Sequence, residues 1–138
     1  MRFWDSSAIA PLLLQEKESA QRQSELEHDP VLVVWWGTAV ELESVLTRRR
    51  CEGTLDEVNE AKARKKLAML ADTWIEVEPT DSVRAMAKRL IRVHRLRSAD
   101  SLQLAAALVA CGNDPQGHIF LTADQVLKTA ASKEGFKV

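Results

Sequence analysis

The chain has 138 residues, of which 46% are hydrophobic and 28% charged, and its formal net charge is −1. This balance excludes an intrinsically disordered chain and a strongly basic nucleic-acid-binding protein of the histone kind. No linker rich in proline, glycine or serine divides the sequence, so we expect a single domain over residues 1–138. Cys51 and Cys111 lie outside any metal-binding or redox motif, and we expect both to be reduced thiols.

The first residues contain neither an apolar signal-peptide core nor a small-residue cleavage site. No uncharged stretch approaches the roughly 20 apolar residues that a membrane helix needs. We therefore expect a cytoplasmic protein that has no membrane partner.

The predicted elements alternate between strands and helices along the chain. Short apolar segments predict five strands, at residues 2–4, 31–35, 74–77, 118–121 and 136–138. A helix is expected after Asp5, where Pro11 could kink it, and a second one carries Glu41 and Glu43. Apolar residues at helical spacing predict a half-buried helix over 83–94, and residues 102–110 are apolar almost all round. This alternation predicts an α/β fold with three α/β/α layers and a mostly parallel central sheet of about five strands.

Basic residues are concentrated in the middle of the chain. Residues 48–99 carry thirteen basic and eight acidic side chains, and residues 82–99 carry six basic side chains and no acidic one. Arg48, Arg49 and Arg50 form a triplet. Such a distribution fits either a solvated helix face or a surface that contacts phosphates.

Two aspartates follow predicted strands. Asp5 comes directly after the strand at 2–4, and Asp124 lies three residues beyond the strand at 118–121. Because ligands of a parallel sheet gather at the carboxyl ends of its strands, both side chains are candidates for one site. Each could also be a helix N-cap.

Three further acids lie near predicted helix starts. Glu41 and Glu43 flank a buried stripe from opposite sides, roughly 160° apart, so only one of them can face a given site. Asp100 precedes the most apolar helix of the chain. An acid in a first helical turn also suits the helix dipole, which is the alternative interpretation of all three.

Asp5, Glu41, Asp100 and Asp124 would form an all-oxygen cluster if they met at one edge of the sheet. Such a cluster repels itself unless a hard cation neutralises it, which favours Mg²⁺ or Mn²⁺. The three histidines, at positions 28, 94 and 118, show no zinc-ligand spacing.

The chain resembles PIN-domain ribonucleases, and in particular the VapC-type toxins of bacterial VapBC toxin–antitoxin systems. The resemblance covers most of the sequence and is carried by residues 3–8 (FWDSSA), 38–44 (TAVELES), 96–105 (LRSADSLQLA) and 121–124 (LTAD). It implies that the catalytic, metal-binding acids are Asp5, Glu41, Asp100 and Asp124. It also implies a homodimer, a cognate VapB-like antitoxin, and inhibition of translation by cleavage of RNA. Gln103 departs from the pattern, since many relatives have histidine there.

The chemistry expected from this resemblance is hydrolysis of an RNA phosphodiester by a water activated by Mg²⁺ or Mn²⁺, leaving 5′-phosphate and 3′-hydroxyl ends. Ser6, Arg97 and Thr122 adjoin the acids and are candidates for substrate binding, with capping or surface charge as the alternative. Trp35 and Trp36 are expected in the core or a dimer interface.

Two other functions remain open at this stage. An aspartyl-phosphate phosphotransferase also places an aspartate after its first strand, but it needs a second acid where this chain has Ser7. A catalytically silent PIN domain would bind RNA or protein without cutting it. That role usually accompanies loss of the acids, and all four are present here.

Overall fold

The computed structural model describes residues 1–138 and contains a parallel sheet of four strands. These are β1 (Arg2–Trp4), β2 (Val33–Trp35), β3 (Ile75–Val77) and β4 (Ile119–Leu121), and they lie in the order β3-β2-β1-β4. All neighbouring pairs are parallel, with Phe3 of β1 opposite Phe120 of β4. The carboxyl ends of all four strands therefore lie at the same edge of the sheet.

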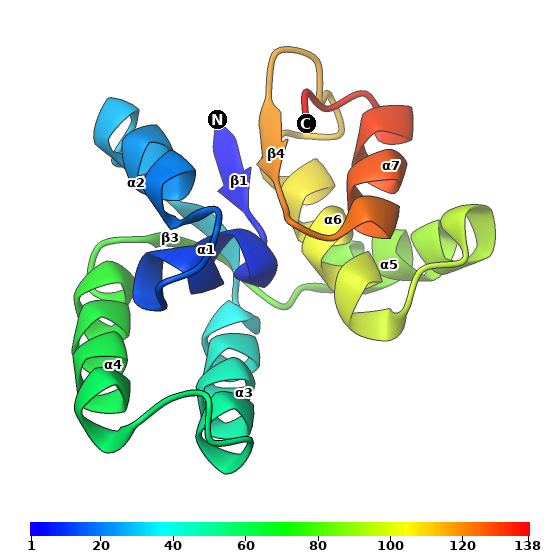
Figure 1. Ribbon diagram of the computed structural model, residues 1–138. Coiled ribbons are helices and arrows are strands. Elements are labelled where there is room, and N and C mark those ends of the chain that lie inside the picture. The colour runs from blue at the N-terminus through cyan, green and yellow to red at the C-terminus, as the bar shows by residue number, and fades with distance from the viewer.

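Seven helices cover the two faces of this sheet (Figure 1). They are α1 (Ser6–Leu13), α2 (Ser19–His28), α3 (Thr38–Cys51), α4 (Glu57–Ala71), α5 (Asp81–His94), α6 (Ser98–Ala110) and α7 (Gln125–Glu134). Helices α5, α6 and α7 pack on one face, and α1 to α4 share the core on the other. Helices α3 and α4 form a hairpin at one end of the molecule (Figure 1). The α/β class and the three α/β/α layers are as expected from the sequence.

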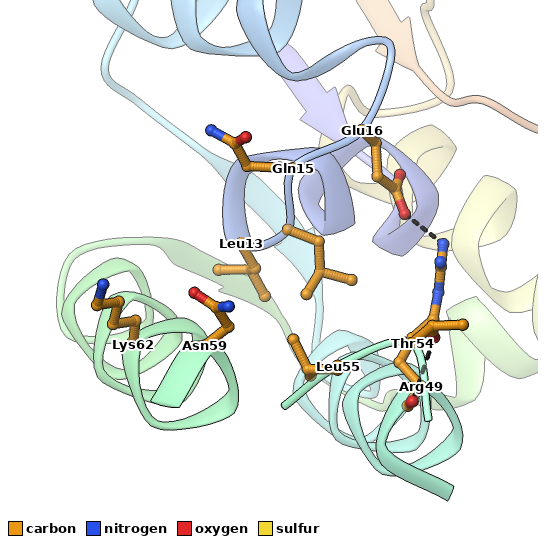
Figure 2. A pocket seen from close by; sticks show the side chains of 9 residues that line it. Leu13, Gln15, Glu16, Arg49, Thr54, Leu55, Asn59 and Lys62 are labelled. Atoms are coloured by element: carbon orange, nitrogen blue, oxygen red, sulfur yellow. Dashed lines mark hydrogen bonds and ion pairs between the residues drawn. The ribbon is translucent and has the colours of Figure 1, made fainter. Parts of the chain in front are cut away.

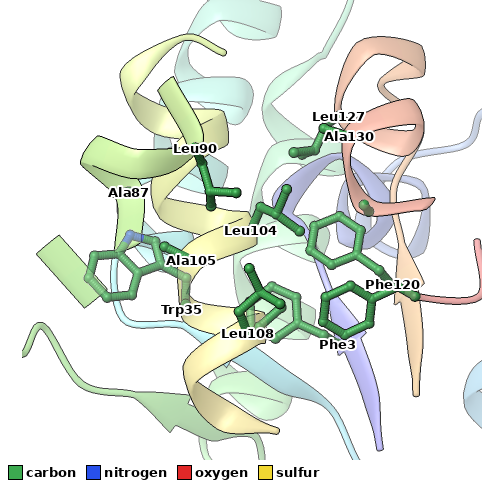
Figure 3. Close-up of a cluster of buried hydrophobic side chains, with 14 of the residues drawn as sticks. Phe3, Trp35, Ala87, Leu90, Leu104, Ala105, Leu108, Phe120, Leu127 and Ala130 are labelled. Atoms are coloured by element: carbon green, nitrogen blue, oxygen red, sulfur yellow. The ribbon is translucent and has the colours of Figure 1, made fainter. Parts of the chain in front are cut away.

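Alternate residues of each strand serve opposite layers, as the pleat of a β-strand requires. Phe3 and Phe120 belong to the core beneath α5, α6 and α7, where their rings stack with centroids 5.4 Å apart (Figure 3). Their neighbours Trp4 and Leu121 belong to the core beneath α1 and α3. The sequences of β2 and β4 are continuously apolar, as expected for strands whose two faces are both covered.

Helix α6 lies at the centre of the first core and is buried on most of its surface. Its small residues, Ala105, Ala106 and Ala107, let it approach the sheet and α5 closely. Helix α5 has the expected two-sided character, since Val83, Ala87 and Leu90 are buried while Arg84, Lys88 and Arg92 face solvent. The apolar character of residues 102–110 and the spacing over 83–94 thus predicted both helices.

The expected fifth strand at residues 136–138 is wrong. Helix α7 ends at Gly135, whose φ of 109° reverses the chain, and only Lys137 then pairs with Ile119 of β4. The apolar Phe136 is buried against the Phe120 ring, with centroids 5.7 Å apart. The segment is apolar because it fills the core beside β4, and a single bridge does not make a strand.

The remaining features agree with the composition. Both cysteines are free, and no helix of this chain combines the length and the apolar character that crossing a bilayer requires. Pro11 lies inside α1, which continues to Leu13. Of the two adjacent tryptophans, Trp35 is buried in the core, whereas Trp36 is half exposed.

Candidate functional site

Asp5 lies at the carboxyl end of β1, with only 3% of its surface exposed. Its Oδ2 accepts hydrogen bonds from the backbone N–H of Ser7 at 3.2 Å, from the Thr122 hydroxyl at 2.9 Å and from the Ser7 hydroxyl. The bond from the Ser7 N–H caps α1. Asp5 is therefore both the N-cap of α1 and a residue at the carboxyl edge of the sheet.

Glu41 lies in the first turn of α3 and is directed toward the same edge. Its Oε2 accepts from the Ser6 hydroxyl at 2.6 Å and from Nε2 of Gln103 at 3.1 Å. The Ser6 hydroxyl also lies 3.4 Å from Oδ1 of Asp5, so it joins the two carboxylates. Glu43, on the other side of α3, forms an exposed ion pair with Arg64 of α4. The structure thus separates the two glutamates, and only Glu41 contacts residues of the Asp5 network.

Asp100 and Asp124 occupy the starts of two further helices. Asp100 lies half-buried in the first turn of α6. Asp124 caps α7, with its Oδ1 accepting from the N–H of Leu127 at 2.7 Å. The N–H of Asp124 donates to the hydroxyl of Thr122, which in turn donates to Asp5. Partial positive charge at these helix N-termini favours the acids.

The four acids affect one another electrostatically. Burial raises the pKa of Asp5, and hydrogen bonds from Ser7 and Thr122 oppose this. Burial also raises the pKa of Glu41, against hydrogen bonds from Ser6 and Gln103, and the charges of Asp5 and Asp100 add to the increase. The pKa of Asp100 is raised by burial and by the charges of Asp124 and Asp5. One concentration of negative charge therefore spans all four predicted site acids.

This donor set fits a hard divalent cation in its chemistry. All four side chains offer carboxylate oxygens, and a cation would relieve the repulsion that, together with burial, raises the pKa values of Glu41 and Asp100. No three acidic, histidine or cysteine side chains converge into a preformed metal centre. Oδ2 of Asp5 is occupied by three donors from Ser7 and Thr122.

The three predicted substrate-binding residues have different surroundings. Ser6 and Thr122 hydrogen-bond to the acids. Arg97 is exposed at the start of α6 and acts on Asp100 only through its charge, which opposes the rise in that group's pKa.

The sequence alone did not identify Ser7 as a member of the hydrogen-bond network around Asp5. Its hydroxyl contacts Asp5 and accepts from the N–H of Ala123 at 2.9 Å, so it ties the ends of β1 and β4 together. The pair of serines directly after Asp5 was the available signal.

A separate pocket of about 480 Å³ lies between the end of α1 and the α3–α4 hairpin (Figure 2). Leu13, Leu14 and Leu55 supply its apolar lining, and the ion pair between Glu16 and Arg49 closes one side. None of the four site acids lines this pocket. The acidic cluster at the sheet edge is therefore distinct from this pocket.

The sequence matches a known protein family. The model of the PIN domain family matches residues 2–133, which include all four acids. No individual curated protein matches the chain at a significant level. PIN domains are in general nucleases and bind RNA. With nearly the whole chain matched, and a parallel sheet whose carboxyl edge is acidic, the protein belongs to the PIN domain family.

Proposed function

We propose that the protein is a metal-dependent endoribonuclease and the toxin component of a type II, VapBC-like toxin–antitoxin system. The observation that carries the nuclease proposal is the convergence of acids at one sheet edge. Ser6 joins Asp5 to Glu41, Thr122 joins Asp5 to the backbone of Asp124, and Asp100 lies near enough for its charge to act on Glu41. These acids come from four separate parts of the chain, which is difficult to explain by helix capping alone. Family membership supports the same class of chemistry.

In this proposal the four carboxylates would hold Mg²⁺ or Mn²⁺. The ion would supply a water of lowered pKa and would stabilise negative charge on the phosphoryl group. The protein's own groups orient the acids. Ser7 and Thr122 hold Oδ2 of Asp5, and Ser6 donates to Glu41. Fixed carboxylates reduce the reorganisation needed to bind the ion.

The RNA backbone needs a positive surface, because the acidic cluster repels phosphates. Helix α5 offers one on its exposed side, formed by Arg84, Lys88, Arg92 and Arg95. Arg97 extends this surface to the start of α6, three residues before Asp100. Binding through such contacts weakens as salt concentration rises.

The toxin role is the finer part of the proposal. It rests on the resemblance of the motifs around the four acids to VapC-type toxins. In that role the chain acts as a homodimer in the bacterial cytoplasm, inhibits translation by cutting RNA, and is inactivated by a cognate VapB-like antitoxin.

The decisive experiment is cleavage of total cellular RNA by the purified protein with Mg²⁺ or Mn²⁺. We expect discrete fragments with 5′-phosphate ends, lost on addition of EDTA and in Asp100→Asn. Asp81→Asn is the matched control, because Asp81 also lies in a first helical turn but is exposed on α5, away from the cluster.

Absence of cleavage in either metal, by a folded and antitoxin-free protein, would overturn the nuclease proposal. RNA retention without cleavage would then favour a silent RNA-binding PIN domain.

A further inference from the structure

Gln103 is a polar residue in an apolar place. It lies on α6, one turn after Asp100, with 1% of its surface exposed, and is followed by the buried residues Leu104 to Leu108. A buried amide is unfavourable unless its polar atoms find partners. A leucine or methionine here would continue the helix's apolar surface, so the amide calls for an explanation.

The amide nitrogen of Gln103 has hydrogen-bond partners, whereas its amide oxygen has none. Its Nε2 donates to Oε2 of Glu41 and to the hydroxyl of Thr38, each at 3.1 Å, and both acceptors lie on α3. Its Oε1 is buried without any partner. An ionised carboxylate only accepts hydrogen bonds, so the NH₂ group must face Glu41 while Glu41 is charged. The side chain therefore satisfies Glu41 and leaves its own carbonyl unsatisfied.

Only one of the two carboxylate oxygens of Glu41 accepts hydrogen bonds. Oε2 receives two donors from two different helices, Ser6 of α1 at 2.6 Å and Gln103 of α6. Oε1 of Glu41 makes no hydrogen bond. Two donors on Oε2 restrict rotation of the carboxylate about its last bond, and they leave Oε1 free to bind another partner.

We propose that Gln103 is a positioning residue that fixes Glu41 so that its Oε1 is presented to a divalent cation. The inference rests on the proposed function, since it assumes that the acidic cluster binds the ion. Because an amide does not titrate, the NH₂ group of Gln103 itself remains a donor at every pH at which the protein is folded.

The test compares Mn²⁺ binding by wild-type protein and Gln103→Met, without RNA, from the electron paramagnetic resonance signal of free Mn²⁺. Methionine keeps the length and apolar stem but has no donor. We expect the dissociation constant to rise about 10–100-fold, the range found when a group that orients a metal ligand is removed. RNA cleavage at limiting Mn²⁺ should fall by a similar factor and recover partly at high Mn²⁺.

The matched control is Gln23→Met. Nε2 of Gln23 also donates to a glutamate, Oε1 of Glu27, at 3.1 Å, but on the exposed surface of α2. Its substitution should leave Mn²⁺ binding unchanged. Thermal unfolding of each variant verifies that the fold is intact, and Gln103→Leu replaces Gln103→Met if the latter does not fold.

A double-mutant cycle separates positioning from packing. If Gln103 acts through Glu41, adding Gln103→Met to Glu41→Gln should weaken Mn²⁺ binding no further. An equal loss in both backgrounds, or no loss in Gln103→Met when Glu41→Gln does lose affinity, overturns the inference and leaves the nuclease proposal intact. A wild-type protein that neither binds Mn²⁺ nor cleaves RNA overturns both.

Discussion

The guanidinium of Arg22 donates to the backbone carbonyl of Thr122 at 3.2 Å, so α2 holds the loop that follows β4. The hydroxyl of the same threonine donates to Asp5. Arg22 is buried and is also paired with Glu18 and Glu25 of its own helix. A charged residue outside the acidic cluster is thereby linked to Asp5 through Thr122.

Arg22→Met should destabilise the protein by about 1–3 kcal/mol, because it removes charge-assisted hydrogen bonds and leaves the Thr122 carbonyl without its donor. Urea unfolding measures this. Arg84→Met is the control, since the Arg84–Asp81 pair is exposed and such pairs contribute only about 0–1 kcal/mol. Equal losses in the two variants would contradict a special role for Arg22.

Glu41→Gln and Glu43→Gln should differ strongly, although the two residues lie on the same turn of α3. The first change removes a charge from the acidic cluster, and we expect RNA cleavage to fall by at least about 10–100-fold. The second removes only an exposed ion pair with Arg64. Single-turnover cleavage rates at fixed Mg²⁺ decide the matter, and a comparable loss in Glu43→Gln would count against our assignment.

The stability of the metal-free protein should depend on pH through Asp100. Its pKa is raised in the folded state by burial and by the charges of Asp124 and Asp5, so the folded protein binds this proton more tightly than the unfolded chain does. Ionised Asp100 therefore lowers stability at neutral pH, and the loss disappears as pH falls through the raised pKa.

Asp100→Asn should accordingly be more stable than wild type at pH 7 in EDTA, and the difference should shrink toward about pH 4, near the ordinary pKa of aspartate. Urea unfolding across this pH range tests the expectation. A wild-type protein that is the more stable one at pH 7 would show that repulsion does not govern the cluster.

Divalent cations should reverse that order. An ion that binds only the folded protein stabilises it by about 2.7 kcal/mol at a concentration 100 times its dissociation constant. Thermal unfolding with increasing Mn²⁺ should raise the Tm of wild type and of Asp81→Asn but not of Asp100→Asn. Identical shifts in all three proteins would indicate binding elsewhere.

Glu134 should contribute stability with the opposite dependence on pH. Burial raises its pKa, but hydrogen bonds from Arg89 and His94 outweigh burial and lower it overall. Both donors lie on α5, at 2.5 and 2.6 Å, so Glu134 joins α7 to α5. A lowered pKa means that the stabilisation is present above the unfolded-state pKa and is lost as pH falls through the folded-state value.

Glu134→Gln should therefore cost about 1–3 kcal/mol at pH 7 and progressively less below about pH 4. Chemical unfolding at both pH values provides the test. A cost that stays constant with pH would mean that packing, rather than charge, is what the glutamate supplies.

Local patterns predicted much of this fold. The apolar strands and the two-sided spacing of α5 are properties of short segments, and so they could be recognised without tertiary information. The strand order depends on long-range contacts, above all the pairing of Phe3 with Phe120, and residue 137 pairs with Ile119 only after helix α7 has returned the chain to the sheet. Residues 136–138 show the limit, since apolar residues that fill a core and apolar residues in a strand look alike in sequence.

The candidate site divides in the same way. Asp5 and Asp124 could be found because each follows a strand, and Asp100 because it heads an apolar helix. The choice of Glu41 over Glu43 rests on the resemblance until the contact with Ser6 is seen. The bonds from Arg22 and Gln103 could not be found, because each joins residues 62 or more positions apart.

The strand order has a bearing on biosynthesis. Strand β4 borders β1 at the edge of the sheet, yet it comes late in the chain. A nascent polypeptide ending at residue 110 carries Asp5, Glu41 and Asp100 but lacks both Thr122 and Asp124. The acidic cluster is thus completed only after residue 124 has left the ribosome. An activity that needs all four carboxylates is therefore absent from a nascent chain that is still attached to its messenger RNA through the ribosome and has not yet reached residue 124.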